Sequence, residues 1–224
     1  MNYHINYNFV WKYFDKLSSG LLLSFEMAFV SIFIGIVIGL GLALAYTGSR
    51  SRLVRWPIAG YVEVIRNVPL LLLVYMVFYG IPTVGGFAYD ATTSFVMTLS
   101  VYAGAYLVEI FRAGLDAVPK GLLDAGKAIG LTPSQLLVSV RLPTMFRIVL
   151  PSLSNTFVSL FKDTAVAWVI AVPELFFGAN WIYTNTFRIV ETWSILTPMY
   201  LVSCYALIFG LQQLEKRYAI RRTA

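Results

Sequence analysis

A line of polar side chains runs through one of the apolar segments of this sequence, between residues 148 and 173. Successive members are three, one, three and four residues apart, so a helix places them all on one face. At bilayer depth such a face must line a water-filled cavity or the interior of a helix bundle. Hydrogen bonding between helices is the alternative, and it suffices for the two serines. The line consists of Ser152, Asn155, Thr156, Ser159 and Asp163.

The neighbours Lys162 and Asp163 are the strongest candidates for a functional role in this line. A charged group inside a span costs about 2.5 to 3.5 kcal/mol on insertion scales. Adjacent side chains on a helix point in different directions, so the two charges need not cancel. We therefore expect Asp163 to be functional, whereas the long stem of Lys162 can snorkel and leaves either role open. Glu26, in an earlier span, either faces the same cavity or packs against Arg112.

Residues that would support covalent or metal chemistry are scarce. The only histidine, His4, lies in the N-terminal tail, and the single cysteine, Cys204, lies in an apolar run. We find no catalytic Ser-His or Cys-His pair and no cluster of metal ligands, so we expect no enzyme, no metal and no cofactor on this chain. The segment Gly121–Ala128 fits GxxxxGK, but Ala128 replaces the hydroxyl residue that binds Mg²⁺. We interpret this match as coincidence, so ATP and Mg²⁺ would have to bind a partner.

The composition predicts an all-α integral membrane protein. Of 224 residues, 58% are hydrophobic and 12% charged, with a mean hydropathy of +0.74, whereas a soluble domain has about 25% charged residues. A helix needs roughly 20 apolar residues to cross the hydrocarbon core. The apolar runs predict a bundle of five transmembrane helices that forms a single domain over residues 1–224. The predicted spans are Leu17–Tyr46, Trp56–Gly80, Ala91–Ala117, Ile148–Pro173 and Thr192–Leu214.

The segments outside the spans have distinct compositions. The aromatic segment Met1–Lys16 is expected to lie along the bilayer surface. Pro and Gly predict a loop over Ile81–Asp90, and Glu174–Glu191 is expected to be a loop or a short surface helix. The polar, basic interval Val118–Arg147 has the length and chemistry of a cytosolic docking loop.

Several residues within the spans are expected to serve packing or charge pairing. In the first span Ser31, Gly35 and Gly39 would let another helix approach closely. Two sets of charged residues at helical spacing are expected to neutralise themselves. These are the pair Glu63 and Arg66, and the ladder Glu109, Arg112 and Asp116.

The distribution of Lys and Arg predicts the orientation, and it accounts for the net charge of +6 without nucleic acid. Only Lys12, Lys16 and Arg188 fall on one side of the predicted bundle. We therefore expect a periplasmic N-terminus and a cytoplasmic C-terminus. The cations on the cytoplasmic side are Arg50, Arg52, Arg55, Lys120, Lys127, Arg141, Arg147, Lys216, Arg217, Arg221 and Arg222.

The docking loop carries a spaced pattern. Asp124-Ala125-Gly126, three residues, Gly130, nine residues and then Val140-Arg141-Leu142-Pro143 resembles the EAA-xxx-G-x9-IxLP loop of ATP-binding-cassette importer permeases. Small residues at 125 and 126 would seat a helix in a partner's groove, Gly130 would permit a sharp turn, and Pro143 would close the segment before the membrane. The segment Arg66–Leu71 and the sequences flanking the loop look like the polar amino acid branch of that family.

This resemblance implies the type I importer permease fold in a bacterial inner membrane. It implies an ATPase dimer that binds ATP and Mg²⁺, a second permease subunit, a periplasmic substrate-binding protein and an amino acid substrate. Coupling would involve Asp124, Ala125, Gly126, Gly130, Leu142 and Pro143. The residues implied to line the pathway are Asn155, Thr156, Ser159, Asp163 and Thr164.

A carboxylate on the polar line would receive the substrate ammonium group. The main rival is an ion-coupled secondary transporter or channel that uses Glu26, Glu109 and Asp163 as ligands for protons or ions. A membrane-embedded enzyme ranks last.

Overall fold

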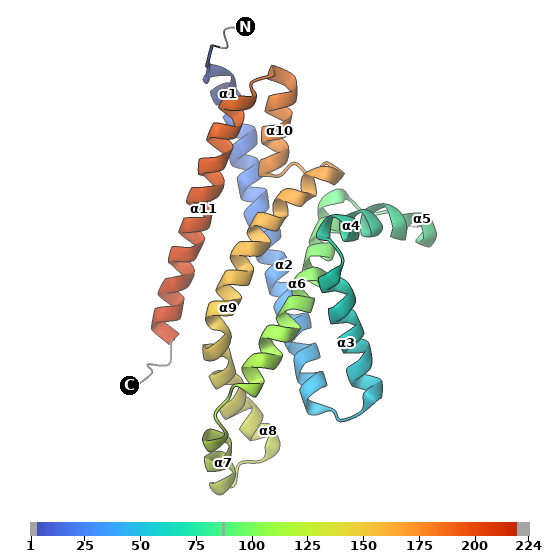
Figure 1. Ribbon diagram of the computed structural model, residues 1–224, viewed down its shortest axis with the longest axis vertical. Coiled ribbons are helices and arrows are strands. Elements are labelled where there is room, and N and C mark those ends of the chain that lie inside the picture. Colours follow the sequence, from blue (N-terminus) through green and yellow to red (C-terminus); the bar gives the residue numbers. More distant parts are fainter. Residues whose placement is uncertain (1–3, 87, 219–224) are drawn as a thin grey trace. The chain divides into compact units, whose positions relative to one another are not determined.

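The computed structural model describes residues 4–86 and 88–218, and within them it is helical without strands, which confirms the all-α expectation. Four long helices dominate (Figure 1): α2 (Phe14–Gly48), α6 (Ala91–Asp116), α9 (Leu142–Asp163) and α11 (Ile189–Tyr218). The chain divides into two compact units. The first contains the chain up to Phe33, Val68–Ser100 and Phe157–Leu207, and the second contains Ile34–Asn67, Val101–Thr156 and the chain from Ile208.

The described chain has four continuous helical runs that are long and apolar enough to span a membrane, and one broken run. The broken run corrects the second predicted span. Helix α3 (Arg52–Asn67) ends before Pro69, and α4 (Leu70–Tyr75), a π-helical turn η1 (Met76–Gly80) and α5 (Ile81–Gly85) follow. Proline lacks an N–H and disfavours a helical residue before it, so the helix stops there.

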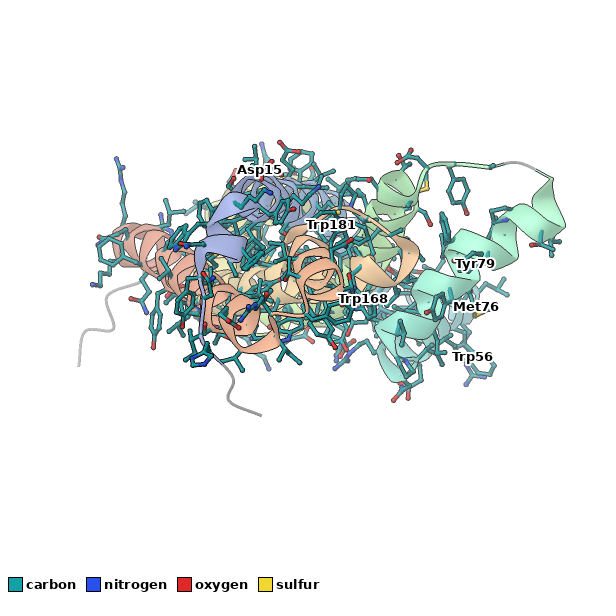
Figure 2. All side chains as sticks on the ribbon, turned by 90° about the horizontal axis from the view of Figure 1, so that it is seen from above. Asp15, Trp56, Met76, Tyr79, Trp168 and Trp181 are labelled. Carbon is teal, nitrogen blue, oxygen red and sulfur yellow. The ribbon has the colours of Figure 1, made fainter. Side chains whose placement is uncertain are left out.

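The prediction of a loop over Ile81–Asp90 is wrong for its first half, because α5 covers Ile81–Gly85. Figure 2 shows Met76 and Tyr79 projecting from η1, and both are largely exposed in this chain.

The third and fourth predicted spans differ in accuracy. Helix α6 starts at Ala91 as predicted, and Asp90 caps it by accepting the Thr93 N–H at 2.9 Å. The fourth span does not begin at Ile148. A continuous helical run covers Pro133–Ile170. It comprises α8 (Pro133–Leu136), a π-helical turn η2 (Leu137–Arg141), α9 and a 3-10 turn η3 (Thr164–Ile170).

The first unit packs α10 (Leu175–Thr186) against the start of α2. Gly20 and Gly178 permit this approach: a Cβ on Gly20 would lie 2.7 Å from the Glu174 carbonyl carbon, and one on Gly178 would lie 2.8 Å from the Lys16 carbonyl oxygen. The sequence predicted a loop or surface helix here, but one face of α10 is buried. Trp181 of α10 and Trp168 of η3 are labelled in Figure 2. The buried apolar cluster consists of Val10, Leu17, Leu175, Ala179, Ile182 and Leu196.

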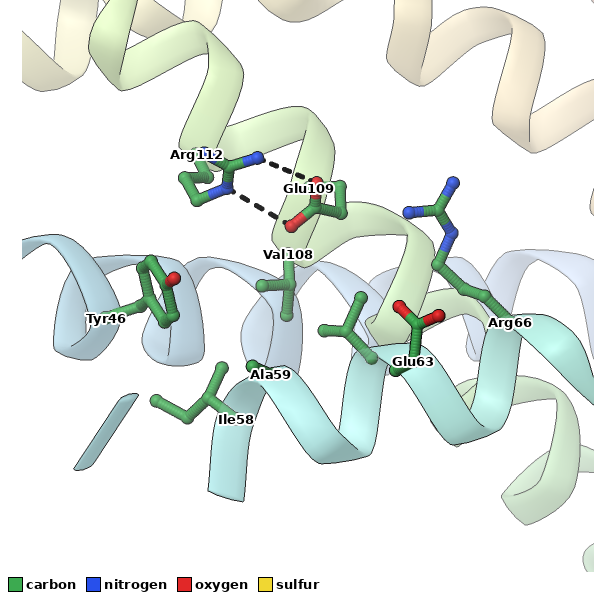
Figure 3. A pocket seen from close by; sticks show the side chains of 9 residues that line it. Tyr46, Ile58, Ala59, Glu63, Arg66, Val108, Glu109 and Arg112 are labelled. Carbon is green, nitrogen blue, oxygen red and sulfur yellow. Dashed lines mark hydrogen bonds and ion pairs between the residues drawn. The ribbon is translucent and has the colours of Figure 1, made fainter. Parts of the chain in front are cut away.

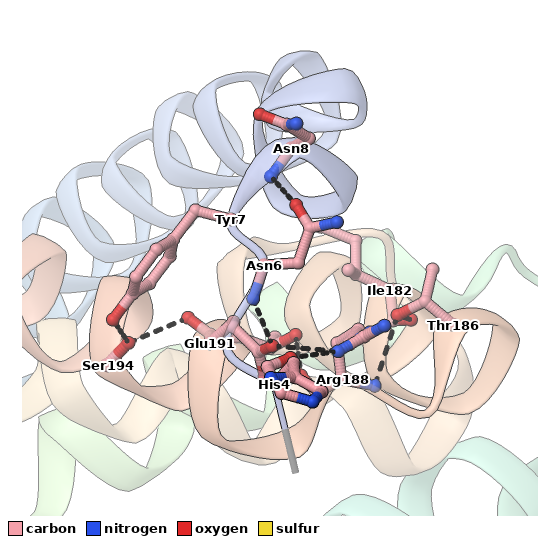
Figure 4. A network of polar contacts seen from close by, with 10 residues as sticks. His4, Asn6, Tyr7, Asn8, Ile182, Thr186, Arg188, Glu191 and Ser194 are labelled. Atoms are coloured by element: carbon pink, nitrogen blue, oxygen red, sulfur yellow. Dashed lines mark hydrogen bonds and ion pairs between the residues drawn. The ribbon is translucent and has the colours of Figure 1, made fainter. Parts of the chain in front are cut away.

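Polar contacts hold the N-terminal tail in the same unit (Figure 4). The Asn6 N–H donates to the Glu191 carboxylate at 2.9 Å, and Arg188 donates to the His4 carbonyl at 2.8 Å and pairs with Glu191 at 3.3 Å. The short α1 (Asn8–Lys12) follows and buries Val10. Of the segment predicted to lie on the bilayer, residues 1–3 are outside the described residues, as are Arg221 and Arg222 at the C-terminal end.

In the second unit α2 and α6 approach closely, as the small residues predicted. A Cβ on Gly35 would lie 2.8 Å from the Ala103 Cβ, and one on Gly39 would lie 2.6 Å from the Leu107 Cβ. In the first unit the Ser31 hydroxyl donates to the Val96 carbonyl at 3.4 Å. The ridge on α2 is therefore a packing surface.

The two charged sets behave differently. The ladder on α6 is confirmed, because Arg112 pairs with Glu109 at 2.9 Å and with Asp116 at 3.8 Å. The prediction that Glu63 and Arg66 of α3 neutralise each other is wrong, because they form no ion pair in the part of the chain that the structure describes.

Candidate functional site

The docking loop predicted over 118–147 is a compact helical turn in the second unit (Figure 1). Helix α7 (Lys120–Ala128) is followed by Ile129 as its cap and by Gly130, whose φ of +81° lies in the left-handed region that favours glycine. Thr132 then caps α8 through a reciprocal contact with Gln135. The expectation that Gly130 makes a sharp turn is confirmed. Because the GxxxxGK match lies in the helix α7, its backbone does not form the loop that cradles phosphate.

Gly126 serves this chain's own packing. It is buried, and a Cβ there would lie 2.5 Å from the Leu136 Cδ1. Gly126 therefore packs inward in this chain, whereas the sequence predicted that both small residues seat in a partner's groove. Ala125 and Asp124 are exposed, and Asp124 pairs only with Lys127 of the same helix among the described residues, at 3.0 Å. The outward surface of α7 is thus formed by the residues around Asp124 and Ala125.

Leu142 and Pro143 lie inside a continuous helical run, so Pro143 does not end a helix here. The π-helical turn η2 comes immediately before them. A π-helical turn spares part of the regular hydrogen-bond ladder, which allows a proline to follow without a break.

Arg141 anchors this turn to α6. Its Nε and an Nη donate to the Leu115 carbonyl oxygen at 3.4 and 3.3 Å, and it lies 3.9 Å from the Asp116 carboxylate. A guanidinium is favourable at a helix C-terminus because the last carbonyls lack partners. Sequence reasoning missed this anchor, although a basic residue in the motif and Asp116 at the end of a span were both visible.

The polar line on α9 faces outward from this chain. In the second unit, Ser152 and Asn155 are exposed and Thr156 is half-buried, with its hydroxyl bonded to the Ser152 carbonyl at 2.9 Å. In the first unit, Ser159 is exposed and Asp163 is half-buried. Such a helix face in a membrane must meet water or another protein surface.

Thr164 does not share this face. It is fully buried, and its hydroxyl donates to the Phe161 carbonyl at 2.7 Å. The structure therefore places Thr164 inside this chain and not beside Asp163 on the polar face.

The ionisable groups near this face lack ion-pair partners in the described chain. Lys162 is exposed and Asp163 is half-buried, and they are not paired with each other. Glu26 of α2 is also exposed and, among described residues, unpaired. Charges at this depth are costly unless water or a partner compensates them.

Glu174 is a buried acid that sequence reasoning placed in a loop. It caps α10, where its carboxylate accepts the Phe176 and Phe177 N–H groups at 2.8 and 2.7 Å. Ser24 and Tyr200 place hydroxyls at 3.5 Å from it. Burial raises the pKa of Glu174 to about 7, and the two N–H bonds only partly oppose this shift. No sequence signal marks this cap, because Glu is not among the residues that usually cap a helix.

Comparison with known proteins now identifies the chain. The model of the family described as "binding-protein-dependent transport system inner membrane component" matches residues 23–220. The chain belongs to this family. The permease is therefore a membrane-spanning transport component and not an enzyme.

Named relatives and solved structures agree with this assignment. The permease is 37% identical over 202 residues to the L-cystine transport system permease protein TcyB of Bacillus subtilis, covering 90% of this chain and 86% of that one. It is 34% identical over 161 residues to the glutamine transport system permease protein GlnP of Escherichia coli, covering 71% and 74%.

A solved amino acid ABC transporter with histidines matches with a TM-score of 0.88 and 29% identity, over 96% of this chain and 100% of that one. The methionine ABC transporter MetNI in an inward-facing conformation matches in fold, with a TM-score of 0.79 and 20% identity, over 92% and 97%. These matches confirm the importer permease fold.

Proposed function

We propose that this chain is the permease subunit of an ATP-driven importer of amino acids. The supporting observation is that the α7–α8 turn, held to α6 by Arg141, continues without a break into α9, whose polar face is open. The relatives are permeases for cystine and glutamine, which supports the substrate class. The chain would act as a single transmembrane domain with a second permease subunit, an ATPase dimer and a periplasmic substrate-binding protein.

Coupling depends on the exposed surface of α7. Asp124 and Ala125 would meet the ATPase, since both are exposed on one short helix. Gly126 and Gly130 keep the turn compact, and Leu142 and Pro143 join it to α9. A displacement of α7 by the ATPase then reaches α9 through one helical run.

The pathway uses the polar face of α9. Asn155, Thr156 and Ser159 offer hydrogen bonds, and Asp163 offers a carboxylate to the substrate ammonium group. Because Asn155 and Ser159 are exposed and Thr156 and Asp163 are only half-buried in this chain, a second permease subunit would complete the site. The short basic loops support a periplasmic N-terminus and a cytoplasmic C-terminus in a bacterial inner membrane.

The test is uptake by the complex reconstituted in proteoliposomes. Radiolabelled glutamine and cystine are supplied with the binding protein outside and ATP inside. Accumulation that requires both the ATPase and ATP supports the proposal. Accumulation by the permease alone under a proton or sodium gradient would instead establish a secondary transporter.

A further inference from the structure

The second unit contains a charged cavity away from the polar face of α9. It has a volume of about 230 Å³ and lies between α3 and α6, with Tyr46 of α2 at one end (Figure 3). Its apolar lining comes from Ile58, Val62 and Val108. Glu63 and Arg66 of α3 point toward the side of α6 that carries Glu109 and Arg112.

The four charges in this cavity are not equally compensated. Glu109 and Arg112 form two hydrogen bonds of 2.9 and 3.2 Å. Glu63, in contrast, accepts only the Asn67 side-chain amide at 3.0 Å, and Arg66 stacks over the Tyr106 ring at 5.2 Å. Within the described chain neither residue has an ion-pair partner.

Glu63 and Arg66 lie in a helix of the broken apolar run, and both are exposed in this chain. At 1.5 Å per residue they lie about 16 and 21 Å along α3 from Arg52. Ionisable groups in a membrane-spanning run face water, a partner or a ligand. Here an anion and a cation one helical turn apart enter the same cavity without neutralising each other.

We propose that this cavity binds the zwitterionic head of an α-amino acid on its way from α9 to the cytosol. The proposal rests on the proposed function and adds a second binding site to it. Arg66 receives the carboxylate through charge-assisted hydrogen bonds, and Glu63 receives the ammonium group, with Glu109 adding negative potential. The apolar lining residues contact the substrate side chain.

Opposite charges on the lining select for a zwitterion. A simple anion meets Glu63 and Glu109, which repel it, and a metal ion meets the guanidinium of Arg66, which repels it. Only a ligand with both charges close together satisfies Glu63 and Arg66 at once. Both side chains are exposed in this chain, so a ligand can reach them.

Thiol protection in the full complex tests the proposal. Cys204→Ala removes the single cysteine, and Ala59→Cys places a thiol on the exposed lining of the cavity. The rate of modification by a small hydrophilic thiol reagent is measured in nanodiscs with each common L-amino acid. The same rate is measured with two derivatives of each amino acid. The amino acid amide keeps the ammonium group but has no carboxylate, and the N-acetyl amino acid keeps the carboxylate but has no ammonium group. The control is Leu53→Cys, on the same helix, highly exposed and outside the cavity.

At least one amino acid should slow modification of the Ala59→Cys thiol by roughly threefold or more near saturation, whereas its amide and its N-acetyl form should not. Adding Arg66→Gln should abolish this protection, Arg66→Lys should retain part of it, and the control thiol should react at one rate throughout. Protection by no amino acid, or equal protection by the singly charged derivatives, overturns the proposal.

The two proposals fail in different ways. If the wild-type complex takes up substrate but the thiol is not protected, only the proposal of a binding site in the cavity is contradicted. If the thiol is protected but uptake does not depend on ATP, only the proposal of an ATP-driven importer is contradicted.

Discussion

Asp163 is the side chain on the α9 face with the largest expected effect on transport. It is half-buried and without an ion-pair partner among the described residues, so a bound ammonium group would gain a charge-assisted hydrogen bond worth about 1.5 to 3 kcal/mol. We expect Asp163→Asn to raise the substrate concentration for half-maximal uptake by roughly tenfold or more. The control is Ser154→Ala, because Ser154 is buried away from this face and bonds the Leu150 carbonyl. Wild-type uptake by Asp163→Asn would remove this residue from the pathway.

Glu174 should make the stability of the permease depend on pH. Its pKa is raised from 4.5 to about 7, so the folded state holds the proton more tightly than the unfolded chain. The stabilisation is therefore complete below pH 4.5 and is lost as the pH rises to about 7, with a total on the order of 3 kcal/mol.

Thermal unfolding of the permease in nanodiscs should accordingly show a lower midpoint at pH 8 than at pH 5. Glu174→Gln should flatten this difference, since an amide does not titrate. An unchanged slope in the variant would assign the pH dependence to other groups.

Individual residues were predictable from the sequence where their chemistry conflicts with their neighbours. Asp163 and Asn155 stand out because they interrupt an apolar run, and Gly130 because its turn needs a left-handed residue. Gly126 and Glu174 were not predictable, because their roles depend on contacts with residues that only the fold brings near.

At the scale of elements, the α7–α8 turn should tolerate changes at one glycine and not at the other. Gly130 has φ +81°, where a β-branched residue costs about 1 to 2 kcal/mol and distorts the turn. We expect Gly130→Val to reduce ATP-dependent uptake to roughly a tenth of wild type while the subunit still inserts.

Gly121→Ala is the matched control, because Gly121 lies in α7 and a Cβ added there would meet nothing within 4 Å. Uptake and binding-protein-stimulated ATP hydrolysis are measured for both variants. Equal uptake by the two would contradict a coupling role for this turn.

The contact between α2 and α6 should be sensitive to side-chain size. Because a Cβ on Gly39 would lie 2.6 Å from the Leu107 Cβ, Gly39→Val should destabilise the permease by about 1 to 3 kcal/mol. Gly41→Ala, two residues along the same helix and with open space around it, should have little effect. Thermal unfolding midpoints in nanodiscs compare the two, and equal midpoints would mean that the helices separate easily.

Elements could be predicted where hydrophobicity alone defines them. Helix α6 starts at the expected residue because a long apolar run follows a capping aspartate. The break at Pro69 was missed although proline is visible in the sequence, and the π-helical turns η1 and η2 were missed because no residue pattern used here marks them. The continuity of α9 with the docking turn was missed for the same reason.

At the scale of the whole molecule, the proposed importer requires one orientation of the chain in the membrane, with α7 on the cytoplasmic side. In the Cys204→Ala background, Asn185→Cys should react with an impermeant thiol reagent in spheroplasts, because it lies on an exposed segment that the proposed orientation puts in the periplasm. Gly121→Cys on α7 should react only after the membrane is opened. Labelling of the α7 thiol from outside would reverse the topology and exclude docking of a cytosolic ATPase.

The paired glycines at the start of α2 and in α10 constrain how that end of the first unit can move. Each backbone lies where the other helix would otherwise carry a side chain, so neither helix can slide along the other without a steric clash. Any conformational change in that part of the first unit has to carry the start of α2 and α10 together.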